Sequence, residues 1–164
     1  MKLNLARTSL GIILLAALVG VAPAAQAHNR SCSQAGVAGK WGYTYTGTIF
    51  HPTAGAIQTA SVGRFTLDAE GNISGTQTRN VGGSTGEETI KGTGTVDQDC
   101  TATYKVDVYD GAGNLLRSAV LAGVFVDDAT ELRAIFTSLV LPNGANLPTV
   151  ITVNAKKLHS EEQD

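Results

Sequence analysis

The sequence predicts an all-β protein, an eight-stranded antiparallel up-and-down β-barrel. Apolar and polar residues alternate with a period of two in eight segments, and clusters of Gly, Asn and Asp separate these segments. Glycines inside the segments suit the strongly coiled wall of a barrel. The alternative is a two-sheet β-sandwich, which needs long connections between its sheets. The predicted strands are 42–50, 60–67, 73–80, 88–96, 101–109, 115–126, 131–141 and 149–158.

Most joints between these segments have the composition of tight turns. Two of them, Asp68 to Asn72 and Asp110 to Asn114, share the pattern D-x-x-G-N followed by an apolar residue. This pattern predicts a type I turn that is closed by a glycine in the left-handed conformation. Only the segment 51–58 has the composition of a longer loop. Hairpins therefore connect the strands in order, which favours the barrel over the sandwich.

The beginning of the chain has the features of an export signal. Lys2 and Arg7 precede an apolar stretch that is too short to span a membrane, and Ala25-Gln26-Ala27 follows it as a cleavage motif. We therefore predict a signal peptide at 1–27, one barrel domain at 28–158 and a charged, disordered tail at 159–164. The mature protein is expected to be secreted or periplasmic, without insertion into the membrane.

The two cysteines, Cys32 and Cys100, are predicted to form a disulfide. An exported chain with one pair of cysteines usually oxidises them. A redox site would need C-x-x-C spacing, which the sequence lacks, and no motif of thiolate metal ligands is present. His28 would become the N-terminal residue, and a copper brace there would need a second imidazole from His51 or His159. A polar chain end is the simpler interpretation, and we expect no metal.

The charge excludes one class of partner. The chain carries a formal net charge of −2 and has no basic run, so nucleic acid is not an expected partner. No motif indicates a cofactor, and no histidine belongs to an evident acid–base relay with a nucleophile. The acidic pairs Glu87-Glu88 and Asp127-Asp128 are interpreted as solvated turn residues. Whether the protein is an enzyme, and in which oligomeric state it exists, stays open at this point.

Gly39-Lys40-Trp41, at the start of the first predicted strand, resembles the G-x-W opening of the calycin barrels, the lipocalins and avidins. In those folds the tryptophan closes the barrel floor beneath an arginine from a late strand. The resemblance therefore implies a structural role for Trp41 and, above it, for Arg133. Trp41 is the single tryptophan of the chain, so the biotin pocket of the avidins has no counterpart here.

The glycine pattern of 62–68, 73–76 and 92–96 resembles that of the secreted bacterial barrels named after allene oxide cyclase. That resemblance implies the same eight antiparallel strands, and it is the one reason to consider a cyclase or isomerase.

Alternation predicts a ligand site inside the barrel. The row that begins at Ile73 continues into Gln77 and Arg79, and Tyr45 lies on the corresponding face of the first strand. We predict that Tyr45, Gln77 and Arg79 hold an acidic or carbonyl group of a ligand. The apolar depth is predicted to be lined by Ile90, Val106 and Val108. In the alternative, Arg79 lies at the rim in solvent and Gln77 bonds a neighbouring backbone group.

Three functions remain compatible with the sequence. The first is a barrel that binds a small, mostly apolar ligand, the second an interaction or structural domain with a filled barrel, and the third a cyclase or isomerase. Eight strands allow either an open or a filled interior. We rank binding first.

Overall fold

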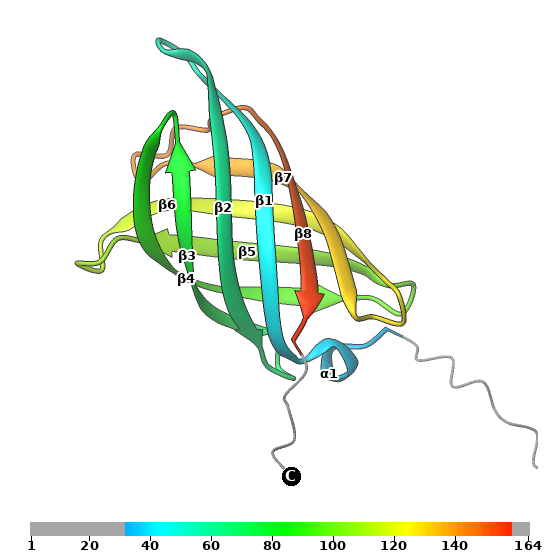
Figure 1. Ribbon diagram of the computed structural model, residues 1–164. Helices are drawn as coiled ribbons and strands as arrows, with labels where there is room; N and C mark the ends of the chain where they lie inside the picture. Colours follow the sequence, from blue (N-terminus) through cyan, green and yellow to red (C-terminus); the bar gives the residue numbers. More distant parts are fainter. Residues whose placement is uncertain (1–31, 159–164) are drawn as a thin grey trace, which may run out of the picture.

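The computed structural model describes residues 32–158, which form a closed barrel of eight antiparallel strands (Figure 1). Each strand pairs with the next along the chain, and β8 pairs with β1 to close the sheet. The predicted fold class is therefore confirmed, and the sandwich is excluded. The elements are α1 (Gln34–Val37), β1 (Gly39–His51), β2 (Gly55–Leu67), β3 (Asn72–Val81), β4 (Ser84–Val96), β5 (Thr101–Tyr109), β6 (Leu115–Val126), β7 (Glu131–Val140) and β8 (Thr149–Lys157).

The predicted signal peptide at 1–27, His28 and the predicted tail at 159–164 lie outside the described residues. Among residues 32–158, no helix has the length and apolarity that crossing a bilayer requires.

The two D-x-x-G-N turns have the same geometry, as predicted. Between β2 and β3, Asp68 Oδ1 accepts a hydrogen bond from the backbone N–H of Asn72 at 2.7 Å. Between β5 and β6, Asp110 Oδ1 accepts the corresponding bond from Asn114 at 2.8 Å. The fourth residue of each turn has a positive φ that glycine adopts without strain. These glycines are Gly71 (φ 93°) and Gly113 (φ 85°).

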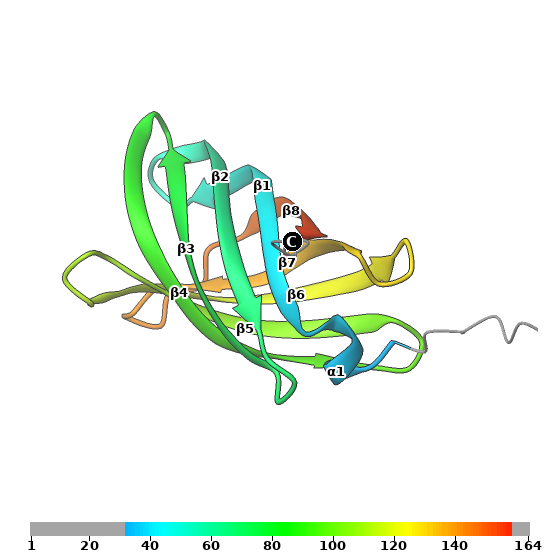
Figure 2. The ribbon, with the colours of Figure 1, turned by 60° about the horizontal axis from the view of Figure 1, so that its bottom comes forward.

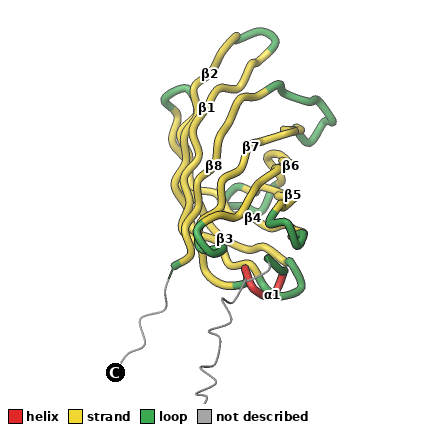
Figure 3. The backbone as a smooth tube through the Cα atoms, turned by 90° about the vertical axis from the view of Figure 1, so that its right-hand side faces the viewer, coloured by secondary structure: helices red, strands yellow, loops and turns green. Residues whose placement is uncertain are grey.

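The segment 51–58 is not a long loop, so that prediction was wrong. β1 continues to His51 and β2 begins at Gly55, and the resulting hairpin extends to the upper end of the barrel (Figure 1, Figure 3). His51 Nδ1 accepts hydrogen bonds from the backbone N–H groups of Thr53 (3.4 Å) and Ala54 (3.3 Å). The histidine side chain thus supplies the acceptor that Asp supplies in the other turns, and turn composition alone did not reveal it.

Trp41 closes the lower end of the barrel. It has no exposed surface, and its Nε1–H donates to the backbone oxygen of Val37 at 3.1 Å. Val37, at the end of α1, is also fully buried. Figure 2, in which this end comes forward, shows α1 beside the start of β1. The Phe65 and Phe125 rings pack against Trp41, with centroids 6.2 and 5.5 Å away.

Arg133 does not cover Trp41, and this expectation from the resemblance was wrong. Its neighbours Leu132 and Ala134 are buried in the barrel, so alternation turns Arg133 outward, where its side chain is 67% exposed. Lys157 takes the place beside the tryptophan, with its Nζ 5.9 Å from the Trp41 ring centroid.

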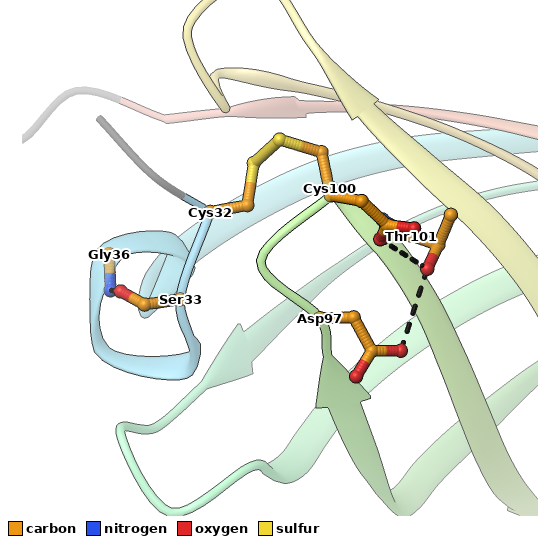
Figure 4. The surroundings of a disulfide bond; sticks show 7 residues. Cys32, Ser33, Gly36, Asp97, Cys100 and Thr101 are labelled. Carbon is orange, nitrogen blue, oxygen red and sulfur yellow. Dashed lines mark hydrogen bonds between the residues drawn. A yellow bond between two sulfur atoms is a disulfide. The ribbon is translucent and has the colours of Figure 1, made fainter. Parts of the chain in front are cut away.

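The predicted disulfide between Cys32 and Cys100 is present, with Cα atoms 4.9 Å apart (Figure 4). It joins Cys32, just before the Ser33 cap of α1, to the turn between β4 and β5, across a sequence separation of 68 residues. Ser33 caps α1 by accepting a hydrogen bond from the Gly36 N–H at 3.0 Å. Closing a loop of this length stabilises the fold by about 4 kcal/mol on the chain-entropy model. A disulfide is typical of proteins in an oxidising, extracellular-type compartment.

Candidate functional site

The barrel contains two cavities that meet at three shared side chains. The mouth cavity, of about 250 Å³, lies at the end of the barrel opposite α1. The inner cavity, of about 70 Å³, lies in the middle of the barrel. Tyr45, Arg117 and Phe136 line both cavities. The mouth is otherwise mostly apolar, with walls that include Ile49, Leu116, Leu139, Leu141, Leu147 and Ile151.

The inner cavity is small. A cavity of roughly 150 Å³ holds a benzene molecule, whereas a water molecule takes roughly 30 Å³ of liquid volume. The inner cavity at about 70 Å³ therefore accommodates roughly two water-sized groups. A ligand of ordinary size can place only one end there.

A buried carboxylate and two arginines lie at the level where the cavities meet. Glu88 on β4 is 4% exposed. Arg117 on β6 binds it through two hydrogen bonds, from Nη1 to Oε1 at 2.9 Å and from Nη2 to Oε2 at 2.6 Å. Arg79 on β3 donates to the same carboxylate from its Nε. The three side chains together carry one excess positive charge.

Gln77 connects this ion cluster to the aromatic side of the interior. Gln77 and Glu88 are direct partners across β3 and β4, and Gln77 Nε2 donates to Glu88 Oε2 at 2.6 Å. The Gln77 Oε1 atom accepts hydrogen bonds from the Tyr43 hydroxyl at 2.6 Å and the Ser61 hydroxyl at 3.3 Å. The amide is therefore fixed in one orientation by partners on both sides.

This network keeps Glu88 ionised. Burial alone would raise the pKa of Glu88, but the hydrogen bonds and positive charge of Arg117, with the hydrogen bonds of Gln77 and Arg79, outweigh burial and hold that pKa below its usual value. Burial acts to lower the pKa of Arg117, yet its contacts with Glu88 and Tyr45 outweigh burial and raise it. Burial raises the pKa of Tyr43, so its hydroxyl remains a donor.

The arrangement is suited to holding an anion rather than to removing a proton. The two Glu88 oxygens accept four hydrogen bonds from Gln77, Arg79 and Arg117, which fills the capacity of a carboxylate. Arg79 uses only its Nε among the described contacts, and its side chain, 24% exposed, lines the mouth cavity. Its two terminal nitrogens match the two oxygens of a ligand carboxylate.

Two β-bulges shape the mouth. Val108 pairs with Arg117 and Tyr109 with Leu115, so Leu116 is an extra residue in β6. Thr137 is the corresponding extra residue in β7. A bulge reverses the alternation beyond it. On β7, the inward-facing position accordingly shifts by one residue at the bulge, so that Leu139 follows Phe136 in the inward row. On β6, both Leu116 and Arg117 line the mouth.

All six residues of the predicted ligand site line the cavities. Gln77 bonds side chains through both ends of its amide, so the backbone-bonded alternative is wrong for its amide. Arg79 is paired with Glu88 and only partly exposed, rather than free in solvent. The inner cavity is lined by Tyr45, Gln77, Ile90, Val106 and Val108, and the mouth by Tyr45 and Arg79.

Sequence reasoning missed two charged residues of the site, Glu88 and Arg117, and gave Tyr104 no part in ligand binding. The interpretation of Glu87-Glu88 as solvated turn residues was wrong for Glu88, because β4 begins already at Ser84. Counting back by two from Ile90 would have placed Glu88 on the inward face, and counting back from Ala119 would have placed Arg117 there. Charged residues are rarely buried unless they are paired, so alternation alone did not assign Glu88 and Arg117 to the interior.

No group of three or more potential metal-ligating His, Cys, Asp or Glu side chains occurs within residues 32–158. His51 accepts hydrogen bonds in its turn, and the other two histidines lie outside the described part of the chain.

Comparison with known proteins adds no family: no protein-family model matches the chain, and no curated protein matches it in sequence.

Proposed function

We propose that this protein binds a small, mostly apolar carboxylic acid at the mouth of its barrel. The observation that carries the proposal is the ion cluster, in which two arginines share one carboxylate beside an apolar cavity. A ligand carboxylate would neutralise the excess positive charge. Arg79 holds the head group through its terminal nitrogens, while Arg117, fixed by Glu88, contributes positive charge behind it.

The cavity volumes support one position for the apolar body of the proposed ligand. Ile90, Val106 and Val108 surround the inner cavity, which at about 70 Å³ is too small for this body. The mouth cavity, of about 250 Å³, is larger and is lined mainly by aliphatic side chains. The body therefore packs in the mouth. Burial of apolar surface contributes about 25 cal/mol per Å², so affinity in the micromolar range is expected for such a ligand.

The predicted export signal and the disulfide support a role outside the cytoplasm, in the periplasm or the medium. The barrel topology and the buried Trp41 at its floor are also consistent with a calycin-like protein, whose members carry small ligands inside the barrel. A carrier or scavenger of apolar acids in that compartment fits both features.

The second candidate is a filled barrel that acts as an interaction domain. The small volume of the inner cavity favours it, and bulky aromatic side chains such as Phe65, Tyr104 and Phe136 line that cavity. A cyclase or isomerase remains the third hypothesis. Its support is the resemblance alone, since Glu88 is saturated by hydrogen bonds.

The test is calorimetric titration of the mature protein with straight-chain acids from hexanoate to dodecanoate and with their methyl esters. We expect acids to bind more tightly than esters. Arg79→Met is expected to weaken acid binding by roughly tenfold and to leave ester binding unchanged, because one charge-assisted hydrogen-bonding group is lost.

Arg133→Met is the matched control, because it removes the same charge from the outer face, where the Arg133 side chain is 67% exposed. Acid binding should be unaffected by this change. If none of the acids or esters binds the wild type, the binding proposal is wrong and the interaction domain becomes the better interpretation.

A further inference from the structure

Tyr104 is a buried hydrogen-bond donor that the ion cluster does not use. The residue is 4% exposed and lines the inner cavity. Its hydroxyl makes no hydrogen bond with any group of the described residues. A buried hydroxyl without an acceptor costs free energy, so native proteins rarely retain one without a purpose.

The position of the Tyr104 ring is fixed by its neighbour across the sheet. Tyr104 pairs with Gly94, and a Cβ atom at Gly94 would lie 2.3 Å from Tyr104 Cδ1. The ring thus lies directly against the backbone of β4, where only glycine leaves room for it. Burial raises the pKa of Tyr104, which keeps the hydroxyl protonated and able to donate.

We infer that the inner cavity is a second subsite, in which the Tyr104 hydroxyl holds a neutral hydrogen-bond acceptor such as a carbonyl oxygen. The size of the cavity, roughly two water-sized groups, fits the polar end of a molecule and excludes its body. The remaining lining beside Tyr104 is largely apolar, including Ile73, Val106 and Val153. The one charged residue that lines this cavity, Arg117, is already bound through both terminal nitrogens to Glu88, whereas a neutral acceptor finds the unpaired Tyr104 hydroxyl.

Combined with the proposed function, on which this step rests, the subsite defines a class of ligand. Tyr104 pairs with Leu121 on β6. Leu121 lies four residues from Arg117, so about 13 Å of strand separates the level of Tyr104 from the level of Arg117. Tyr45, Arg117 and Phe136 separate the two cavities, so a chain that extends inward from the mouth passes between them. The ligand expected is an oxo acid, with its carboxylate at Arg79, its methylene chain in the mouth cavity and its carbonyl end at Tyr104.

The experiment compares each straight-chain acid with oxo acids of the same length that carry the carbonyl group at successive positions. We expect one position to give roughly tenfold tighter binding to the wild type, the value of one good hydrogen bond in a dry site. Tyr104→Phe should abolish this preference while binding the unsubstituted acid normally. Tyr109→Phe, which makes the same chemical change at a ring that contacts Lys91 outside both cavities, should preserve it.

A second arm separates the subsite from the mouth. Acetonitrile, a slender neutral acceptor, and propyne, its apolar counterpart, are titrated by NMR, and amide shifts are followed on β5 and β6. We expect acetonitrile to shift resonances around Tyr104 in the wild type and not in Tyr104→Phe, and propyne to bind less well.

The two arms give distinct results. Binding of simple acids without a Tyr104-dependent preference for any oxo acid overturns the subsite and leaves the proposed function standing. Tyr104-dependent acetonitrile binding without acid binding supports the subsite and overturns the mouth site. Absence of both kinds of binding overturns both proposals.

Discussion

Glu88 is the residue on which the polar end of the barrel depends. It is the one acidic partner of Arg79 and Arg117 in the described ion pairs, and it also fixes Gln77. Removing one partner of a buried ion pair costs more than the pair contributes, because the remaining charge is left in a poorly solvated place.

We expect Glu88→Gln to lower the free energy of unfolding by about 3 kcal/mol, because two guanidinium groups then lose their counter-charge. The measurement is urea-induced unfolding at neutral pH. Glu87→Gln is the control, since the adjacent side chain is exposed and surface substitutions change stability by about 0.5 kcal/mol or less. Equal stability of the two variants would contradict a central role for Glu88.

At the scale of elements, the two D-x-x-G-N turns show that one motif can stand in two environments. Gly71 and Gly113 have similar positive φ angles. A Cβ atom at Gly71 would lie 2.4 Å from the backbone oxygen of Gly94, whereas one at Gly113 would meet nothing within 4 Å. The backbone N–H of Gly71 donates a hydrogen bond within the turn, and the carbonyl oxygen of Gly71 accepts one from the Gly94 N–H at 2.8 Å. The β2–β3 turn is therefore packed against the end of β4.

We expect Gly113→Ala to destabilise the protein by about 1–2 kcal/mol, the cost of the left-handed conformation for a residue with a Cβ atom. Gly71→Ala should cost at least about 1 kcal/mol more, because backbone atoms must also shift. Thermal and urea unfolding of the two variants side by side measure the difference. Indistinguishable stabilities would mean that the β2–β3 turn moves freely away from β4.

At the scale of the whole molecule, several carboxylates link stability to pH in the same direction. The pKa of Glu88 is lowered by Arg117 and its other partners against the effect of burial. The pKa values of Asp68 and Asp110 are lowered by hydrogen bonds, first of all from the Asn72 and Asn114 side chains. Hydrogen bonds from Thr101 lower the pKa of Asp99. Below the ordinary carboxyl pKa, the unfolded chain therefore binds more protons than the folded one.

It follows that the stability these groups contribute is fully present above about pH 5 and is lost as the pH falls through about 4 and below. We expect the urea midpoint to decrease steadily in that range. Glu88→Gln should show a shallower decrease, because one of the titrating groups is gone. A midpoint that stays constant down to about pH 3 would contradict this linkage.

The architecture was predictable from the sequence because the information for it is local. Alternation with a period of two identifies a strand and its faces, and turns rich in Gly, Asn and Asp, two of them with the D-x-x-G-N pattern, mark where one strand ends and the next begins. The inward row through Gln77 followed from the same alternation. The pairing of Cys32 with Cys100 followed from their number and from the predicted compartment.

Tertiary structure decided which inward residues meet. Alternation assigns a face but gives no distance across the barrel, so Arg117 and Glu88, 29 residues apart, could not be joined from the sequence. The bulges at Leu116 and Thr137 change the phase of the alternation, and they alter side-chain packing around the mouth without a sequence signal of their own. The volumes of the cavities depend on how aromatic side chains from several strands fill one space, which only the closed barrel determines.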